Sequence, residues 1–297
     1  MIHLPPVGTR VTLRHRLPPG SVPPLTDVVG HLLDVTPTIR VRTKTGVVVD
    51  VSPADVIAVR ALTDAPVRTS QIRNLEHAAA LAWPGLEQHW LDGWLLRFSG
   101  GQSHRANSAV PLDVHATLRS LPAIVDWYRT RDATPWLAVP DRLVRLPDGV
   151  PAALESMVMT SRFDATPVAS AEVSPEPDER WMRIYARAVD VDVLTAVLDG
   201  ELGFATLAGA AVGRCAVTRA PDGTRWAGLA AVRVDEGHRR EGHALALCSA
   251  LLGWAAERGA TQAYVQVLSD NVAAMSLYRS MGFTTQHRVR YVDGRTL

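Results

Sequence analysis

The chain has 297 residues, which is too long for one small core and suits two or three domains. Hydrophobic residues make up 47% and charged residues 21%, a balance typical of folded globular proteins rather than disordered or membrane-spanning ones. The net charge of +1 gives no overall field that would attract nucleic acid or an acidic membrane. Composition therefore argues against both as partners.

The cysteines and the N-terminus indicate a reducing compartment. Cys215 and Cys248 are the only cysteines, so no disulfide framework is expected, and each lies in an apolar run that predicts a buried side chain. The chain does not start with a basic segment followed by an apolar one. No stretch reaches the roughly 18 apolar residues of a membrane span. We expect a cytoplasmic protein without a membrane segment.

Residues 1–64 are predicted to form a small SH3-like β-barrel. Short alternating or β-branched runs such as "TRVTLRHR" and "TIRVRTK" are separated by Pro, Gly and Thr-Pro turns. Nucleic-acid binding by this domain would give steep salt dependence. The segment contains no Phe, Tyr or Trp on which a single-stranded base could stack, which argues against that alternative.

Residues 65–168 carry mixed helical and extended patterns. From about residue 69, apolar spacing near 3.6 predicts helical structure in "SQIRNLEHAAALAWPG" and "LEQHW", followed by a strand and turn in "DGWLLRFSGG". The segment "VDWYRTR" is expected to be helical and "TPWLAVP" extended. Residues 151–163 read as a helix followed by a strand. The polar, Pro- and Glu-rich residues 169–179 are predicted to be a linker.

Residues 169–297 are predicted to alternate helices and strands. Two short helical segments are followed by a strand pair, a third strand ending at Val234, a helix ending at Gly259, a strand, a helix and a last strand. On the long helix, one apolar face is expected; its residues are Leu245, Cys248, Leu251, Leu252 and Ala255.

The segment between Val234 and this helix, "DEGHRREGHALAL", has the composition of an anion-binding loop. The first backbone N–H groups of a helix have no partner and attract negative charge. Gly242 and Ala244 keep bulk away, and Arg239 and Arg240 add donors. A P-loop would need Lys and Ser or Thr after its second glycine, where His243 and Ala244 stand, and no G-x-G-x-x-G is present. The pattern [Q/R]-x-x-G-x-[G/A] fits residues 239–244.

Together with a second signature, "SDNVAAMSLYRSMGF", this pattern makes residues 178–297 resemble the GCN5-related N-acetyltransferase (GNAT) family. The resemblance implies an α/β (α+β) fold with a mixed central sheet flanked by helices, and acetyl-CoA as cosubstrate. It assigns the pantetheine arm to one strand and the pyrophosphate to the loop, and places Asn271 near the arm. The implied cosubstrate-binding residues are Val232, Arg233, Val234, Arg239, Arg240, Glu241, Gly242, His243, Ala244, Leu245 and Asn271.

The resemblance also implies a catalytic residue and shows one departure. Tyr278, the tyrosine of "LYxxxGF", is the expected general acid for the departing CoA thiolate, and a packing role is the alternative. Gln266 stands where several members carry a glutamate base, so the base is another group, a water chain, or not required. His238 and His243 have no third ligand nearby, and no metal is predicted.

The segment "DGWLLRFSGGQSHRANS" resembles the N-terminal half of a subset of bacterial acetyltransferases. That resemblance implies that residues 65–168 are a degenerate acetyltransferase-like unit ahead of a catalytic domain over 169–297. Arg105, Asn107 and Ser108 either line the acceptor pocket or form a hydrogen-bonded turn, and the turn is favoured.

The sequence thus predicts an acetyl-CoA-dependent N-acetyltransferase that transfers acetyl directly to an amine on a small molecule or a peptide. Direct transfer is expected because no cysteine stands beside a histidine base. The alternative is a catalytically weak acetyl-CoA-binding regulatory protein. Neither the acceptor nor the oligomeric state is predicted.

Overall fold

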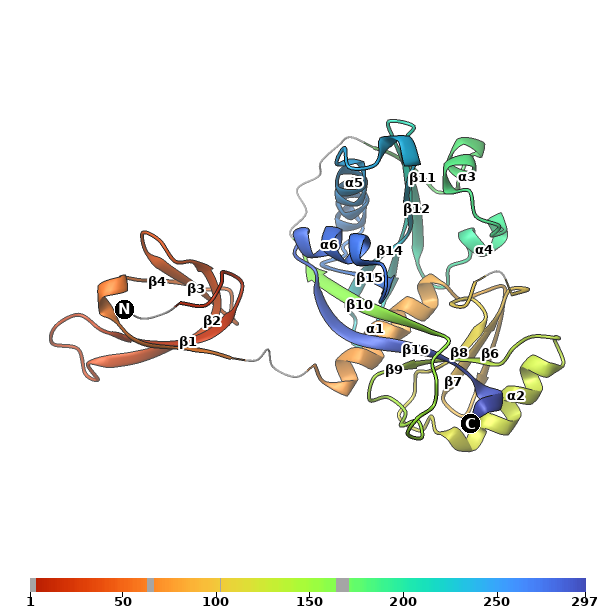
Figure 1. Cartoon of the computed structure of the whole chain (residues 1–297), viewed down its shortest axis with the longest axis horizontal. Helices are drawn as coiled ribbons and strands as arrows, with labels where there is room; N and C mark the ends of the chain where they lie inside the picture. The colour runs from red at the N-terminus through yellow and green to blue at the C-terminus, as the bar shows by residue number, and fades with distance from the viewer. Residues whose placement is uncertain (1–3, 63–66, 102, 164–170) are drawn as a thin grey trace. The chain divides into compact units, whose positions relative to one another are not determined.

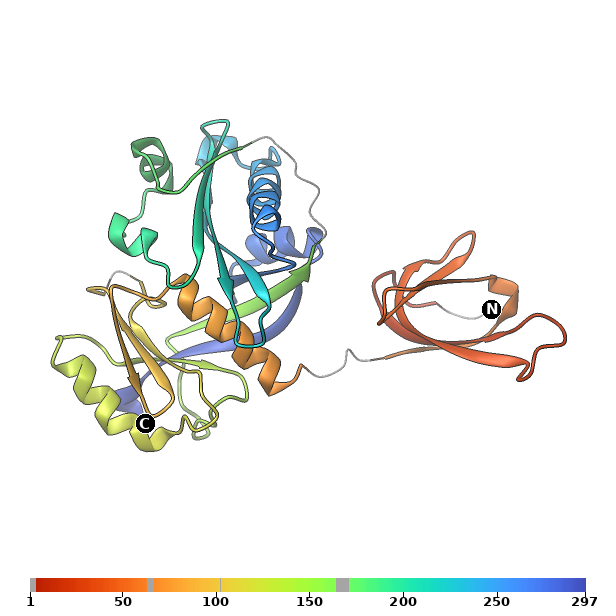
Figure 2. The same ribbon diagram turned by 180° about the vertical axis from the view of Figure 1, so that it is seen from behind.

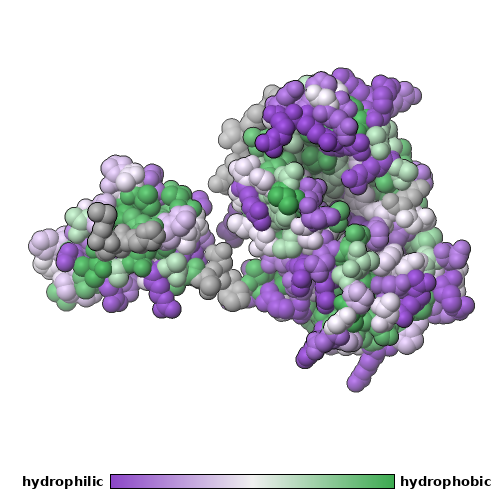
Figure 3. Space-filling view, in the orientation of Figure 1, coloured by the Kyte–Doolittle hydropathy of each residue, from purple (hydrophilic) through white to green (hydrophobic). Residues whose placement is uncertain are grey.

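A computed structural model describes residues 4–62, 67–101, 103–163 and 171–297. The chain separates into two compact units, Met1–Pro66 and Val67–Leu297, shown in Figures 1 and 2. No helix of the described residues is long and apolar enough to cross a membrane. Hydrophilic and hydrophobic residues are mixed over the face of the molecule seen in Figure 3.

The first unit is a five-stranded antiparallel sheet in the order β4-β3-β2-β1-β5. Alternate side chains point to one face, and these form its core, which includes Val11, Leu13, Leu32, Ile39 and Val41. This confirms a small all-β domain. Its strands are β1 (Arg10–Arg16), β2 (Leu25–Asp34), β3 (Ile39–Thr43), β4 (Val48–Val51) and β5 (Val56–Ala61), with a 3-10 turn at Pro53–Asp55.

The second unit is built on one 11-stranded mixed sheet, in the order β11-β12-β13-β14-β15-β10-β16-β9-β8-β7-β6, and helices flank it, as predicted. Its first elements are α1 (Thr69–Ala82), β6 (Glu87–Leu91), β7 (Trp94–Phe98), β8 (Ser108–Pro111), α2 (Leu121–Arg129), β9 (Trp136–Pro140) and β10 (Leu154–Arg162). The later elements are β11 (Glu172–Ser174), α3 (Glu179–Tyr185), α4 (Val191–Thr195), β12 (Glu201–Leu207), β13 (Ala211–Arg219), β14 (Arg225–Val234), α5 (His243–Glu257), β15 (Gln262–Leu268), α6 (Val272–Ser280) and β16 (Thr284–Asp293). Three further 3-10 turns lie at Leu118–Ser120, Glu236–His238 and Gly294–Thr296.

Two halves of this unit repeat the same topology and exchange one strand each. In the first half β6, β7 and β8 are antiparallel, and α2 crosses over to β9, which is parallel to β8. In the second half β12, β13 and β14 are antiparallel, and α5 crosses over to the parallel β15. However, β10 of the first half pairs with β15, and β16 of the second half pairs with β9. The two halves therefore share one sheet.

This exchange bears on the expected boundary between residues 168 and 169. The boundary itself lies outside the described residues, but β10 lies between β15 and β16 and is hydrogen-bonded to both. The segments before and after the boundary belong to one compact unit.

Three secondary-structure predictions were wrong. The segment "LEQHW" belongs to strand β6, because five residues do not distinguish a helical period from an extended one and pairing with β7 decides. Residues 151–163 contain no helix, and their apolar run forms β10 between two other strands. The described part of the expected linker contains β11, which pairs with β12, and its last residue opens α3.

Helix α5 packs its apolar face on the second half of the sheet. Cys248, Leu251 and Ala255 are fully buried as predicted, but Leu245 is 45% exposed and Leu247 is buried instead. The helix ends at Glu257, close to the expected end, and Gly259 follows its C-cap with a φ of 77°, the left-handed conformation that glycine adopts readily.

The exchange of β10 and β16 between the two halves predicts which shortened chains can fold. A chain beginning at residue 165 lacks β10, which leaves β15 and β16 without their shared partner. We expect it not to fold, whereas a chain beginning at 67 retains the whole compact unit and should melt cooperatively. Circular dichroism with thermal melting tests both. Cooperative melting of the chain that begins at 165 would contradict the structural role given to β10.

Candidate functional site

Two parallel strands at the centre of the second half diverge. Strands β14 and β15 are paired from Trp226 opposite Gln262 to Leu229 opposite Val265, and no pairing follows. Beyond that point, residues 229–233 and 265–268 line opposite sides of one cavity. Divergence leaves main-chain groups on the facing edges available to an extended ligand.

A β-bulge shapes this edge of β14. The register between β13 and β14 shifts between Val212, which is opposite Arg233, and Arg214, which is opposite Ala230. At the bulge, Ala231 has a φ of 53°, a left-handed conformation that costs a non-glycine residue about 1 kcal/mol. Ala231 also lines the cavity. Backbone strain of this kind is often retained at binding sites.

The loop between β14 and α5 presents unpaired main-chain donors. Arg240 has a φ of 71° and Gly242 a φ of 83°, and the helix begins at the next residue, His243. Within the described chain, the N–H groups of residues 239–245 have no hydrogen-bond partner. A cluster of unpaired amides at a helix start suits an anion.

Most side chains of this loop are exposed, His243 is partly buried, and they pair locally. Arg239 forms an ion pair with Glu236 at 3.1 Å, and Glu241 lies 3.1 Å from His243 Nε2. The rings of His238 and His243 are 6.1 Å apart. Among the described residues, no group of three or more His, Cys, Asp or Glu side chains is placed to hold a metal ion.

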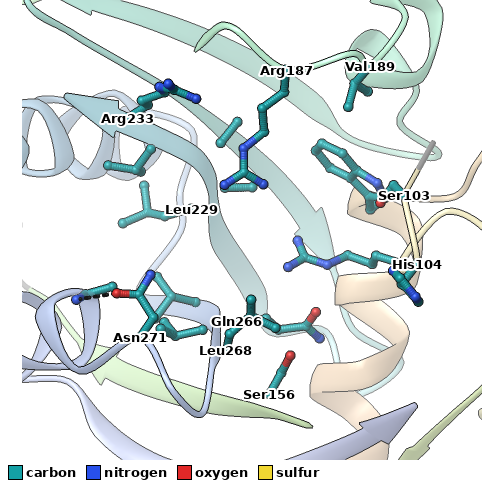
Figure 4. A pocket seen from close by; sticks show the side chains of 18 of the residues that line it. Ser103, His104, Ser156, Arg187, Val189, Leu229, Arg233, Gln266, Leu268 and Asn271 are labelled. Atoms are coloured by element: carbon teal, nitrogen blue, oxygen red, sulfur yellow. Dashed lines mark hydrogen bonds between the residues drawn. The ribbon is translucent and has the colours of Figure 1, made fainter. Parts of the chain in front are cut away.

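One cavity of about 700 Å³ joins the divergent strands to the first half of the unit. Figure 4 shows Gln266, Ser156 and Asn271 on one side of it and Arg187 extending into it from the segment between α3 and α4. The cavity also reaches residues 103–105 of the first half. Of the residues predicted to bind cosubstrate, those that line it are Val232, Arg233, Arg239 and Asn271. Those that do not line it are Val234, Arg240, Glu241, Gly242, His243, Ala244 and Leu245.

Tyr278 lies on α6 and lines this cavity, with only 6% of the residue exposed. Burial and the neighbouring Cys248 thiol raise the pKa of its phenol well above the ordinary value, and the Arg105 guanidinium opposes them. The phenol is therefore protonated at neutral pH. Burial also raises the pKa of Cys248 to about 12, so this thiol is not a nucleophile at neutral pH.

Asn271 and Gln266 have different surroundings. Asn271 caps α6, because its side-chain oxygen accepts a hydrogen bond from the Ala274 N–H at 3.1 Å (Figure 4). Gln266 Oε1 is buried beside the cavity and has no hydrogen-bond partner among the described residues. An unsatisfied buried carbonyl oxygen is costly, which marks it as a position for a ligand donor.

Arg105, Asn107 and Ser108 of the first half have different surroundings. Asn107 Oδ1 accepts hydrogen bonds from the N–H groups of Ser99 and Gly101, so it stabilises a turn. Ser108 is fully buried and its hydroxyl accepts a hydrogen bond from Arg97 at 3.0 Å. Only Arg105 lines the cavity. Asn107 thus fits the turn interpretation, whereas Ser108 begins strand β8 and binds Arg97.

Several cavity residues carried no sequence signal that we could interpret. Arg187 follows Ala186, the left-handed C-cap of α3 with a φ of 46°, and lies in an exposed segment without a pattern. His104 stands beside the predicted Arg105 and packs against Trp136 and Tyr291 at 5.1 and 5.9 Å between ring centroids.

The sheet with its divergent strands, the bulge and the amide-rich loop define an acetyltransferase of the GNAT type. Residues 69–292 match a family model described as "Probable histone acetyltransferase Rv0428c C-terminal", and residues 5–60 match "Rv0428c N-terminal Sm-like domain". The chain belongs to this Rv0428c family of acetyltransferases, and the predicted GNAT resemblance and a small β-rich N-terminal domain are confirmed.

Individual relatives agree with this assignment. A Mycobacterium tuberculosis protein named "Probable histone acetyltransferase Rv0428c" is 50% identical over 100% of this chain and 98% of its own. The Bacillus subtilis "Uncharacterized N-acetyltransferase YobR" is 26% identical, over 74% of this chain and 98% of its own. A solved GCN5-related N-acetyltransferase from Kribbella flavida aligns with a TM-score of 0.55 and 16% identity, over 77% of this chain and 96% of that one, and shows the same fold.

Proposed function

We propose that this acetyltransferase moves the acetyl group of acetyl-CoA directly to an amine, with Tyr278 as general acid. The observation that carries the proposal is the cavity in which the divergent strands, Arg239 of the loop and a buried protonated phenol meet. The unpaired amides of residues 239–245 would hold the pyrophosphate, and the open edges of β14 and β15 would hold the pantetheine arm.

In the reaction, the neutral amine attacks the thioester carbonyl and the C–S bond breaks. The departing sulfur takes a proton. Tyr278 is the cavity residue suited to give it, because its phenol is protonated. The phenol then regains a proton from solvent or from the amine. Direct transfer is favoured over a covalent acyl-enzyme, because burial raises the pKa of both Cys215 and Cys248 to about 12.

The experiment combines calorimetry with turnover. Acetyl-CoA should bind the whole protein, and CoA should be released in the presence of a suitable member of an amine panel, with one acetylated amine formed for each CoA. Binding without turnover on any amine would favour the regulatory alternative. Failure to bind acetyl-CoA would refute the proposal.

His104 is the candidate for the base. Among the described cavity residues it is the one side chain that exchanges a proton near neutral pH, since the lining contains no Asp, Glu or Lys. Burial lowers the pKa of its imidazole below the ordinary value of 6.5, so the proton-accepting form dominates at pH 7. Gln266 would then orient the amine through its unpaired oxygen.

This assignment predicts a pH effect. Wild-type kcat/KM should rise as the pH increases, and the midpoint of this rise should lie below pH 6.5. The reason is that the neutral imidazole is the active form and its pKa is lowered. His104→Gln should remove this limb and reduce kcat/KM at pH 7 about 10-fold, less than for an enclosed base since water can partly replace it. A rate profile measured from pH 5 to 9 tests this. An unchanged limb would leave His104 as a packing residue.

A further inference from the structure

The cavity has a marked excess of positive charge. Four arginines line it, and its described lining contains no carboxylate. Arg233 and Arg239 lie on β14 and on the loop, at the end proposed for the CoA phosphates. Arg105 and Arg187 come from the first half and from the segment after α3, on segments that the CoA assignment does not use.

Arg105 and Arg187 are not neutralised by the protein. Neither forms an ion pair with a described residue. The Arg105 guanidinium lies 5.6 Å from the Trp83 ring centroid and hydrogen-bonds the Tyr291 phenol, and neither of these neutral groups cancels its charge. The charges of both arginines lower the pKa of the Tyr185 phenol against the effect of burial, so both act on one part of the cavity wall.

Two further arginines, Arg214 and Arg97, are buried behind this part of the cavity wall and add to its positive electrostatic potential. Arg214 stacks on Trp83 at 4.3 Å and donates to the carbonyl oxygens of Leu194 at 2.7 Å and Ala82 at 2.8 Å. Burial lowers its pKa to about 9, so it still carries a charge at neutral pH. Arg97 is likewise buried and donates to the backbone oxygens of Ser108 and Trp83.

One buried carboxylate partly offsets these charges. The acid whose charge acts on Arg97 is Glu76, which is buried and hydrogen-bonded to His287 Nε2 at 2.9 Å. The arginines around Trp83 outnumber this carboxylate, and charges inside a protein are weakly screened, so this part of the wall attracts anions and repels cations.

From this arrangement we infer that the acceptor is a small amine that also carries an anionic group, a carboxylate or a phosphate, bound by Arg105 and Arg187. Its amine would donate a hydrogen bond to the unpaired Gln266 Oε1. A cavity of about 700 Å³ that must also receive the end of the CoA arm leaves room for a small molecule. A lysine-rich peptide or a polyamine would bring like charge to the arginines. The inference rests on the proposed function and specifies its substrate class.

The test pairs substrates with variants. Amino acids are compared with their carboxamides, with 2-aminoethyl phosphate, with spermidine and with a lysine-rich peptide as acceptors. We expect wild-type kcat/KM to favour an anionic amine over its neutral amide by about 10-fold or more, the size of a charge-assisted contact. Comparing the amino acids with 2-aminoethyl phosphate identifies whether the arginines bind a carboxylate or a phosphate.

Arg187→Gln and Arg105→Gln should each raise KM for the anionic acceptor about 10-fold and reduce the preference over the amide, and Arg→Lys should restore part of it. Arg187 is exposed, so its substitution should leave folding intact. Arg183→Gln is the matched control, since Arg183 is an exposed arginine of α3 that does not line the cavity.

Three results would overturn the inference: equal rates with acid and amide, preference for the lysine-rich peptide or spermidine, or variants that weaken acetyl-CoA binding rather than acceptor use. The last would place Arg105 and Arg187 on the CoA phosphates. Each of these leaves acetyl-CoA binding by the wild-type protein intact, whereas its loss would contradict the proposed function itself.

Discussion

Gly242→Glu should weaken acetyl-CoA binding at least about 100-fold, the loss expected when a charge opposes a fully engaged anion site. A Cβ at Gly242 meets no atom within 4 Å, so the new side chain extends into the open space at the start of α5. There its carboxylate would compete with the pyrophosphate for the unpaired amides and repel it.

Gly223→Glu provides a matched control. Gly223 has a φ of 86° and no atom within 4 Å of a Cβ, so backbone strain and added charge are the same as at Gly242. It lies in the turn that precedes β14, whereas the loop follows the far end of that strand. Calorimetry should find wild-type affinity for Gly223→Glu. Equal affinities for the two variants, both folded by thermal melting, would refute the loop as the pyrophosphate site.

The sequence predicted best those features that depend on residues close to one another in the chain. The pattern over residues 239–244 depends on small residues and backbone donors at one helix start, and the structure shows that geometry in Arg240, Gly242 and the free amides. Asn271 and Tyr278 lie on one helix, so their spacing brings both to the same cavity. The residues of the loop and of α6 could therefore be predicted from the sequence.

The arrangement of β10 and β16 was not predictable in the same way. An apolar run such as that of β10 suits a buried helix or a buried strand, and its partners are more than 90 residues away in sequence, as with Met157 opposite Val267. Arg187 illustrates the same limit at the site. It enters the cavity because α3 ends in a left-handed residue and the chain folds back, which no short pattern encodes.

Tyr278→Phe should lower kcat about 100-fold, the lower end for a positioned acid, while the affinity for acetyl-CoA changes less than about 5-fold. The ring remains to pack against Phe283, at 5.6 Å between centroids, so only the proton is lost. Tyr264→Phe is the control: Tyr264 is fully buried on β15 and does not line the cavity, so its kcat should stay near that of the wild type.

The leaving group separates protonation from positioning. A selenium analogue of acetyl-CoA releases a selenol, which is more acidic than a thiol and needs less help from an acid. The loss caused by Tyr278→Phe should therefore shrink with this donor. If the loss is the same with both donors, the hydroxyl positions the substrate without protonating the leaving sulfur. If kcat does not fall with either donor, Tyr278 is a packing residue, and water must deliver the proton to the sulfur.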